Sequence, residues 1–177
     1  MARPEGMTGP ATNSLHDLAQ RYKQRYADAD QDAIEITMRM FASEVVGHAA
    51  QARFFRMLGK ERSMARYTVL RILYFADGRL ISQKEIGDQT RATSANVTYL
   101  IDGLEGEGLV ERVQDPQDRR FSYVRLTAEG QELAAFLVPK MVEFMDHLLR
   151  GFSETDKRTF IDLISRFQAN AETSYVE

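Results

Sequence analysis

Residues 80–113, "LISQKEIGDQTRATSANVTYLIDGLEGEGLVERV", contain the most informative pattern in the chain. Ser82 and Glu85 have the spacing of a capping box, which predicts that a short helix begins at Gln83 and ends near Gln89. After a turn through residues 91–93, apolar side chains recur at the spacing of one helix face: Val97, Leu100, Ile101 and Leu104. Two short helices joined by a tight turn indicate a helix-turn-helix.

The next stretch, "VERVQDPQDRRFSYVRL" at residues 110–126, predicts two short strands joined by a turn. Pro116 fixes its own φ angle, and Asp115 and Asp118 are expected to bond nearby backbone amides. Arg119 and Arg120 are therefore predicted to stand at a rigid hairpin tip. The alternative is a solvated charged turn that protects the edge of a hairpin from aggregation.

Helical patterns also lie on the N-terminal side of this stretch. The apolar residues between Leu15 and Tyr26 predict a short accessory helix. From Asp30 onward the apolar positions form a heptad-like seam, which predicts a long helix that ends near Gly59. The segment after Ser63 is apolar nearly all round, so we expect a central helix there.

Two further helices are predicted after the hairpin. Thr127 can cap a long helix with a second heptad-like seam, and Pro139 is expected to kink this helix or to remove one backbone hydrogen bond. Ser153 and Asp156 have capping-box spacing and predict the start of a last helix. The expected fold class is mainly α (α+β), with a winged helix-turn-helix between N-terminal and C-terminal helices.

The composition limits the kinds of protein that this chain can be. Its 177 residues are enough for one ordinary domain with an extension, and no apolar run approaches the ~20 residues of a membrane span. The chain has no cysteine, which excludes disulfides and thiolate metal sites. The first residues lack the apolar core of a secretory signal, so a cytoplasmic protein is expected.

The formal net charge of −3 argues against nucleic-acid binding by bulk charge. Residues 83–126 alone carry six basic and eight acidic side chains, a local charge of −2. Any affinity of this region for DNA must therefore come from the arrangement of its charges, and we expect a shallow dependence on salt.

The second helix of the helix-turn-helix has a face that suits DNA readout. Opposite its apolar stripe lie Ala95, Tyr99 and Asp102, and Asn96 and Thr98 flank them. Asn can pair with adenine, Thr and Ala methyl groups can meet thymine, and Tyr can bond phosphate. The alternative is an ordinary solvated helix face. The hairpin arginines can enter a narrow minor groove, or one of them can pair with Asp102.

No residues point to catalysis or to a metal. The three histidines, His16, His48 and His147, are far apart and lack metal-binding spacing. No nucleophile–base pair, phosphate-binding glycine loop or carboxylate pair stands out. The sequence therefore predicts no enzyme, no metal site and no cofactor.

The run from Leu80 to Gly130 resembles the winged helix-turn-helix of the MarR (multiple antibiotic resistance regulator) family. Its marks are "LIDGLEGEGLVERV" at the end of the second helix, "DPQDRR" in the wing and "VRLTAEG" before the next helix. The resemblance implies a homodimer, and a transcription regulator, usually a repressor, whose affinity for a palindromic operator is changed by a small ligand. It also implies four parts: a flexible leader (1–14), N-terminal accessory and dimerisation helices (15–62), the winged DNA-binding lobe (63–127) and C-terminal dimerisation helices (128–177).

By family position, the resemblance also implies site residues. Those expected to contact DNA are Ser94, Ala95, Asn96, Thr98, Tyr99, Arg119 and Arg120, with Asp102 and Asp118 bracing the wing against the reading helix. The resemblance places the ligand between the dimer helices and the lobe, where the chain is rich in aromatic side chains. From the residues there we expect a pocket for an aromatic or anionic effector that includes His48, Phe55, Tyr67, Arg71 and Tyr74. The sequence departs from the family at Tyr99, where many members have arginine or lysine, and at Gly103 and Gly106, where longer residues are common.

Two alternatives stay open at this point. A winged helix with a negative local charge can be a protein–protein interaction module that binds no operator. His48 can be a hydrogen-bonded core residue and Arg71 can pair with a structural carboxylate, in which case neither would contact a ligand.

Overall fold

The computed structural model of the protein describes residues 10–59, 63–115 and 122–174. The chain divides into two compact units, Met1–Ser63 and Met64–Glu177. The first unit contains α1 (Pro10–Arg25) and α2 (Gln31–Met57). The second contains α3 (Met64–Tyr74), β1 (Ile81–Ser82), α4 (Gln83–Thr90), α5 (Ser94–Gly106), β2 (Val110–Gln114), β3 (Ser122–Leu126), α6 (Ala128–Leu148) and α7 (Glu154–Thr173).

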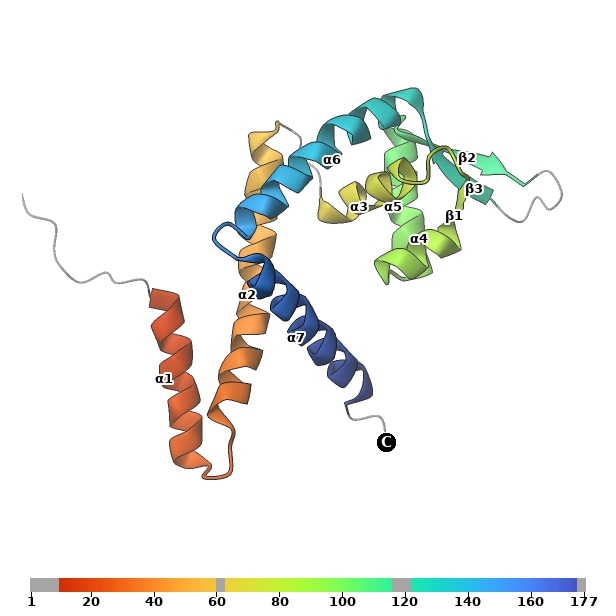
Figure 1. The fold of residues 1–177 in the computed structure, drawn as a ribbon. Helices are drawn as coiled ribbons and strands as arrows, with labels where there is room; N and C mark the ends of the chain where they lie inside the picture. The colour runs from red at the N-terminus through yellow and green to blue at the C-terminus, as the bar shows by residue number, and fades with distance from the viewer. Residues whose placement is uncertain (1–9, 60–62, 116–121, 175–177) are drawn as a thin grey trace, which may run out of the picture. The chain divides into compact units, whose positions relative to one another are not determined.

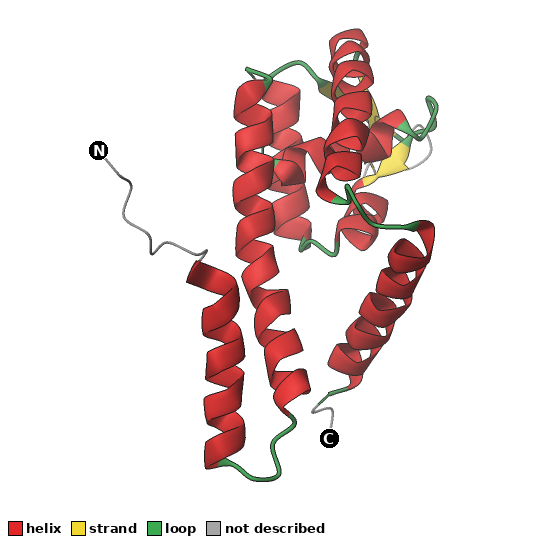
Figure 2. Cartoon of the chain, turned by 60° about the vertical axis from the view of Figure 1, so that its left-hand side comes forward, coloured by secondary structure: helices red, strands yellow, loops and turns green. Residues whose placement is uncertain are grey.

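The first unit is a helical hairpin in which α1 and α2 run side by side (Figures 1 and 2). Ala19 is fully buried, because a small side chain lets the two helices approach closely. Asp30 caps α2, and its Oδ1 accepts from the backbone N–H groups of Asp32 at 3.0 Å and Ala33 at 3.1 Å. The helix α1 begins at Pro10, inside the segment expected to be a leader. Proline favours a first helical position, since no hydrogen bond is required of its nitrogen there.

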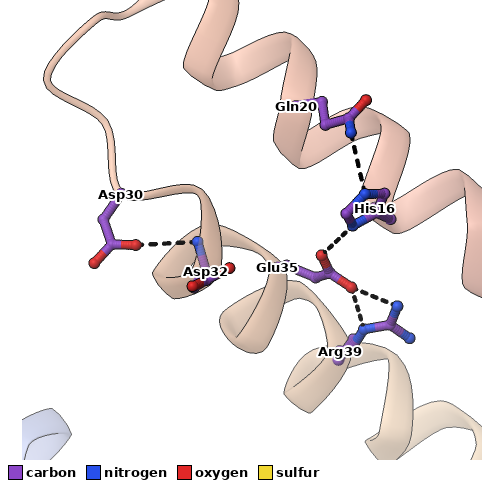
Figure 3. Close-up of polar contacts among 6 residues, drawn as sticks. All are labelled: His16, Gln20, Asp30, Asp32, Glu35 and Arg39. Carbon is purple, nitrogen blue, oxygen red and sulfur yellow. Dashed lines mark hydrogen bonds and ion pairs between the residues drawn. The ribbon is translucent and has the colours of Figure 1, made fainter.

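A polar cluster also joins the two helices of this unit (Figure 3). His16 Nδ1 lies 2.7 Å from Glu35 Oε2, and Arg39 Nε donates to Glu35 Oε1 at 2.8 Å. The Gln20 amide lies 3.1 Å from His16 Nε2, which fits an imidazole that carries its proton on Nδ1. The hydrogen bond from His16, followed by that from Arg39, lowers the pKa of the Glu35 carboxyl.

The core of the second unit lies around α3, as the sequence predicts. This helix packs against α4, α5, α6 and β3, and five of its eleven residues are buried. The residues of this unit whose large side chains are almost fully buried come from all of its elements except α7: Val69, Leu70, Ile81, Ile86, Val97, Ile101, Leu104, Val110, Val124, Leu137 and Met141. The mainly α, winged helix-turn-helix fold expected from the sequence is confirmed.

The small antiparallel sheet has the strand order β1-β3-β2 (yellow in Figure 2). Ile81 pairs with Val124, and the register of the two longer strands runs from Val110 opposite Leu126 to Gln114 opposite Ser122. The short strand β1 leads directly into α4, so the sheet fixes the start of the helix-turn-helix.

The junction between the wing and α6 explains the sequence "LTAEG". Thr127 Oγ1 donates to the carbonyl of Gly108 at 2.6 Å and accepts from the backbone N–H of Gly130 at 3.0 Å. A Cβ at Gly130 would lie 1.8 Å from the carbonyl oxygen of Leu109. Only glycine therefore fits where the first turn of α6 crosses the chain that enters β2.

The last helix, α7, begins with the predicted capping box. The Ser153 side chain accepts from the backbone of Asp156, and the Asp156 carboxylate accepts from the backbone of Ser153. No residue of α7 in the described part of the chain is buried, and its apolar side chains Phe160, Ile161 and Leu163 are exposed. Within the described residues no helix is long and apolar enough to span a membrane.

Candidate nucleic-acid interface

The helix-turn-helix consists of α4, a tight turn and α5. The Ser82 side chain accepts from the backbone N–H of Glu85 at 3.1 Å, which caps α4 as expected. The Glu85 carboxylate makes a different bond from the one that a capping box predicts: it accepts from both Nη atoms of Arg79, at 2.6 and 3.2 Å. Arg91 ends α4 in the left-handed region with φ 52°. This conformation turns the chain sharply toward α5.

The helix α5 buries the stripe that its spacing predicts. Val97, Ile101 and Leu104 are buried, and Leu100 is half-buried. The Thr93 side chain accepts from the backbone N–H of Asn96 and caps the helix. The opposite face of α5 is therefore left free of the core.

The exposed face of α5 carries the residues that the sequence predicts to read DNA. Their side chains are all exposed, and that of Tyr99 is 78% exposed: Ser94, Ala95, Asn96, Thr98 and Tyr99. No charged residue occurs from Ser94 to Leu100. Thr98 Oγ1 donates to Gln83 Oε1 at 3.2 Å and links α5 to the first turn of α4. The backbone N–H groups at the start of α5 add a positive potential to this uncharged face.

Arg112 braces β2 against α5. Its guanidinium donates to the carboxylates of Asp102 and Glu105, and its backbone N–H donates to Glu105 Oε1 at 3.1 Å. Partial burial acts to lower the pKa of Arg112, but the two carboxylates outweigh it and raise this pKa. The sequence pattern had suggested only Arg119 or Arg120 as the partner of Asp102. The sequence does contain a sign of this contact. Asp102 and Glu105 are three residues apart on α5, so their carboxylates lie on the same side of the helix and can bind one arginine.

A second contact fixes the end of α5. Arg66 on α3 pairs with Glu107, which follows α5. A Cβ at Gly103 would lie 3.0 Å from Nη2 of Arg66. The glycine at this position therefore makes room for the Arg66 guanidinium.

Two side-chain hydrogen bonds join the two sides of the wing in its described part. Arg125 Nε donates to Glu111 Oε1 at 2.6 Å between paired residues of β3 and β2. Nearer the tip, the Tyr123 hydroxyl donates to Asp115 Oδ2 at 3.1 Å, and this bond raises the pKa of Tyr123. The predicted DNA-contacting residues Arg119 and Arg120, and the predicted brace residue Asp118, lie outside the described residues.

The turn between α4 and α5 contains a hollow of about 470 Å³ beside the reading face. Lys84 and Arg91 line it together with Ser94, which puts two cations close to the N-terminus of α5. Arg91 Nη1 also lies 3.1 Å from Glu172 Oε1 of α7. Sequence reasoning named neither cation. Asp88 also lines the hollow, so these cations lie beside one acidic side chain.

The residues of the predicted ligand pocket come from both units of the chain. His48 is exposed and Phe55 is buried on α2, whereas Tyr67 is buried and Arg71 and Tyr74 are half-buried on α3. Burial raises the pKa of Tyr67, and the nearby charge of Arg71 partly opposes this shift. The structural carboxylate considered as a partner of Arg71 is not seen: its guanidinium makes no hydrogen bond or ion pair with any described residue.

Comparison with known families finds one family model that matches residues 63–121, that of the MarR family. The helix-turn-helix transcription regulator YdgJ of Bacillus subtilis is 34% identical over 108 residues, which are 61% of this chain and 65% of YdgJ. The transcriptional repressor YetL of the same organism is 24% identical over 144 residues, 81% of this chain and 84% of YetL. The transcriptional regulator HosA of Escherichia coli O111:H- is 30% identical over 101 residues, 57% of this chain and 73% of HosA.

Among solved structures, the PcaV transcriptional regulator of Streptomyces coelicolor has a similar fold. Its crystal structure gives a TM-score of 0.62 at 24% identity and covers 76% of this chain and 97% of PcaV. A structure of PcaV in complex with its natural ligand gives a TM-score of 0.60 at 23% identity and covers 97% of this chain and 99% of PcaV.

Proposed function

Because the chain belongs to the MarR family of transcription regulators, we propose that it is a homodimeric, sequence-specific DNA-binding repressor that a small anionic or aromatic ligand releases from a palindromic operator. The observation that carries the proposal is the exposed face of α5, which offers hydrogen-bonding groups without charge. The braces through Arg112 and Arg66 hold this helix, so its side chains can be presented to a groove with little loss of freedom.

The DNA contacts follow from this placement. Ser94, Ala95, Asn96, Thr98 and Tyr99 would enter the major groove, and Lys84 and Arg91 would meet the adjacent phosphates. Arg119 and Arg120 of the wing would reach the minor groove, and Asp118 would help to hold that tip. Binding to an operator would place the protein with the chromosome, in the cytoplasm.

Dimerisation is supported by the apolar side chains that the single chain leaves exposed on its N-terminal and C-terminal helices. Phe41, Val45 and Val46 are exposed on α2, and Phe160, Ile161 and Leu163 are exposed on α7. Exposed apolar side chains gathered on particular helices are typical of surfaces that bind another protein. A two-fold dimer would place two reading helices about 34–36 Å apart, one turn of the duplex.

Repression and ligand release are supported by the relatives alone. YetL is named a transcriptional repressor, and PcaV was solved with its natural ligand. For this chain, His48, Phe55, Tyr67, Arg71 and Tyr74 remain the proposed ligand-binding residues, and Arg71 has the strongest support because its guanidinium has no partner in the described residues.

The test is a gel shift with the intergenic DNA that flanks the gene. Asn96→Ala is expected to lower the affinity of the dimer by about 1–3 kcal/mol, because it removes a base-reading amide. The matched control is Gln131→Ala, which removes an exposed amide from α6. Equal affinities of wild type and Asn96→Ala for the DNA would refute the proposal that Asn96 on α5 contacts bases. A wild-type dimer that binds no flanking duplex would favour the protein-interaction module instead.

A further inference from the structure

The exposed face of α5 lacks the side chains that recognise guanine. Arginine and lysine bind the N7 and O6 acceptors of guanine in the major groove, and α5 contains neither residue from Ser94 to Gly106. Carboxylates can accept a hydrogen bond from the N4 amino group of cytosine, but those of Asp102 and Glu105 are both bound by Arg112. In this described helix, neither kind of charged group is left to select a G·C pair.

Thr98 offers a base its methyl group, because its hydroxyl proton is already used. Thr98 Oγ1 donates to Gln83 Oε1 at 3.2 Å, in the contact between α5 and α4. The Thr98 side chain is exposed, and so is that of Ala95, which lies about one turn earlier on the same helix. Methyl groups of threonine and alanine make apolar contact with the C5 methyl group of thymine in the major groove. Thr98 and Ala95 therefore favour thymine.

Asn96 adds a hydrogen-bonding group that matches adenine. Its backbone N–H bonds the Thr93 side chain, whereas its exposed side-chain amide makes no hydrogen bond with any described residue. The amide therefore keeps both its donor and its acceptor for a base. Adenine presents an acceptor at N7 and a donor at N6, so an asparagine amide can bond both. Guanine presents two acceptors at the same edge and would leave the Asn96 carbonyl without a donor.

We propose that α5 selects adenine–thymine pairs, with Asn96 on an adenine and the methyl groups of Thr98 and Ala95 on thymines. The inference rests on the proposed operator binding and adds the class of base pair that the operator carries beneath α5. Tyr99 is 78% exposed, and its hydroxyl can bond a phosphate without a preference between bases. Because the proposed dimer is two-fold symmetric, both half-sites of the operator should carry the same A·T pairs.

The test is selection of duplexes by the full-length chain from a pool with a randomised central region, followed by sequencing. Wild type is expected to enrich palindromes with A·T pairs in each half-site, and Asn96→Ala should relax the preference at the position that Asn96 contacts. Replacing that A·T pair with G·C should weaken the binding of wild type roughly five- to hundredfold in a gel shift. Gln131→Ala is the matched control, because it removes an exposed amide from α6, and it should select the same duplexes as wild type.

Two further substitutions at exposed positions of α5 test the chemistry of the contacts. Asn96→Arg should change the preference at its position from A·T to G·C, because a guanidinium binds O6 and N7 of guanine. Thr98→Ser keeps the hydroxyl but removes the methyl group, so the preference for thymine should be lost. Thr98→Val removes the hydroxyl but keeps a methyl group, so this preference should be retained.

Enrichment of G·C pairs in the half-sites would overturn the inference and leave the proposed function intact. The same holds if Asn96→Arg selects the duplexes that wild type selects, because the preference would then come from the shape of the DNA. A preference for thymine that survives in Thr98→Ser would overturn the role of the Thr98 methyl group. A pool from which wild type enriches no duplex would instead refute sequence-specific operator binding, and the inference with it.

Discussion

Two glycines of the lobe, Gly130 and Gly106, have opposite surroundings. A Cβ at Gly130 would collide with the carbonyl oxygen of Leu109, which is backbone and cannot turn away, whereas a Cβ at Gly106 would meet nothing within 4 Å. We expect Gly130→Ala to lower the free energy of unfolding by about 2–3 kcal/mol through overpacking. Gly106→Ala, the matched control, should be neutral or stabilise the lobe by up to about 1 kcal/mol. Urea unfolding followed by circular dichroism measures both, and equal midpoints would contradict the close approach at Gly130.

The Glu35 carboxyl leads to a prediction about how the stability of the protein depends on pH. Its hydrogen bonds to His16 and Arg39 make the folded-state pKa lower than the unfolded value, so Glu35 stabilises the α1–α2 hairpin above its unfolded pKa of 4.5. This stabilisation is lost as the pH falls through the lowered folded-state pKa. We expect wild type to lose more stability than Glu35→Gln between pH 6 and about pH 3. Glu44→Gln is the control, because it removes an exposed carboxylate from the same helix. It should lose as much stability as wild type does when the pH falls. A pH profile of Glu35→Gln parallel to that of wild type would rule out the role of this carboxyl.

The contacts of Arg112 brace β2 against α5 and so set the position of the wing relative to this helix. Arg112→Met removes the contacts to Asp102 and Glu105. The cost in stability should be no more than about 1 kcal/mol, since both carboxylates are partly exposed. Operator affinity should fall more, roughly tenfold or about 1.4 kcal/mol. The reason is that the wing and α5 are then no longer held in a fixed relative position when they bind DNA. Arg125→Met is the control, because it breaks an ion pair inside the wing without touching α5. If both variants bind the operator equally well, the brace does not position the wing.

The helices themselves follow from sequence because their signals are local. Ser82, Thr127 and Ser153 each cap the helix that the sequence predicts, and the apolar stripe of α5 is buried as expected. Contacts between elements are harder to predict, because they depend on the register of a strand against a helix. The pairing of Arg112 with Asp102 and the fit of Arg66 over Gly103 could not be derived from periodicity alone. Arg71 illustrates the same limit: the sequence could place it only on a central helix, and the fold shows that it lines a hollow together with residues of β1 and α4.

Among the described residues of the single chain, those of α7 include none that is buried. Ile161 is 66% exposed on this helix. We expect Ile161→Glu to convert the proposed dimer into a folded monomer, because a charge would then face the apolar interface. Light scattering after size-exclusion chromatography measures the mass, and the gel shift should lose affinity in parallel. Asn170→Glu adds the same charge on the opposite face of α7 and should remain dimeric. A monomeric wild type, or a dimeric Ile161→Glu, would refute the role of α7.

The uncharged first two turns of α5 have a consequence for a living cell. Proteins that hold DNA through many lysine–phosphate contacts dissociate as the salt concentration around them rises, because each contact releases a counterion. A regulator that reads its operator with Asn96, Thr98 and Tyr99 releases fewer counterions. Its occupancy of the promoter would therefore follow the concentration of its effector and stay nearly constant as the water content of the cell changes.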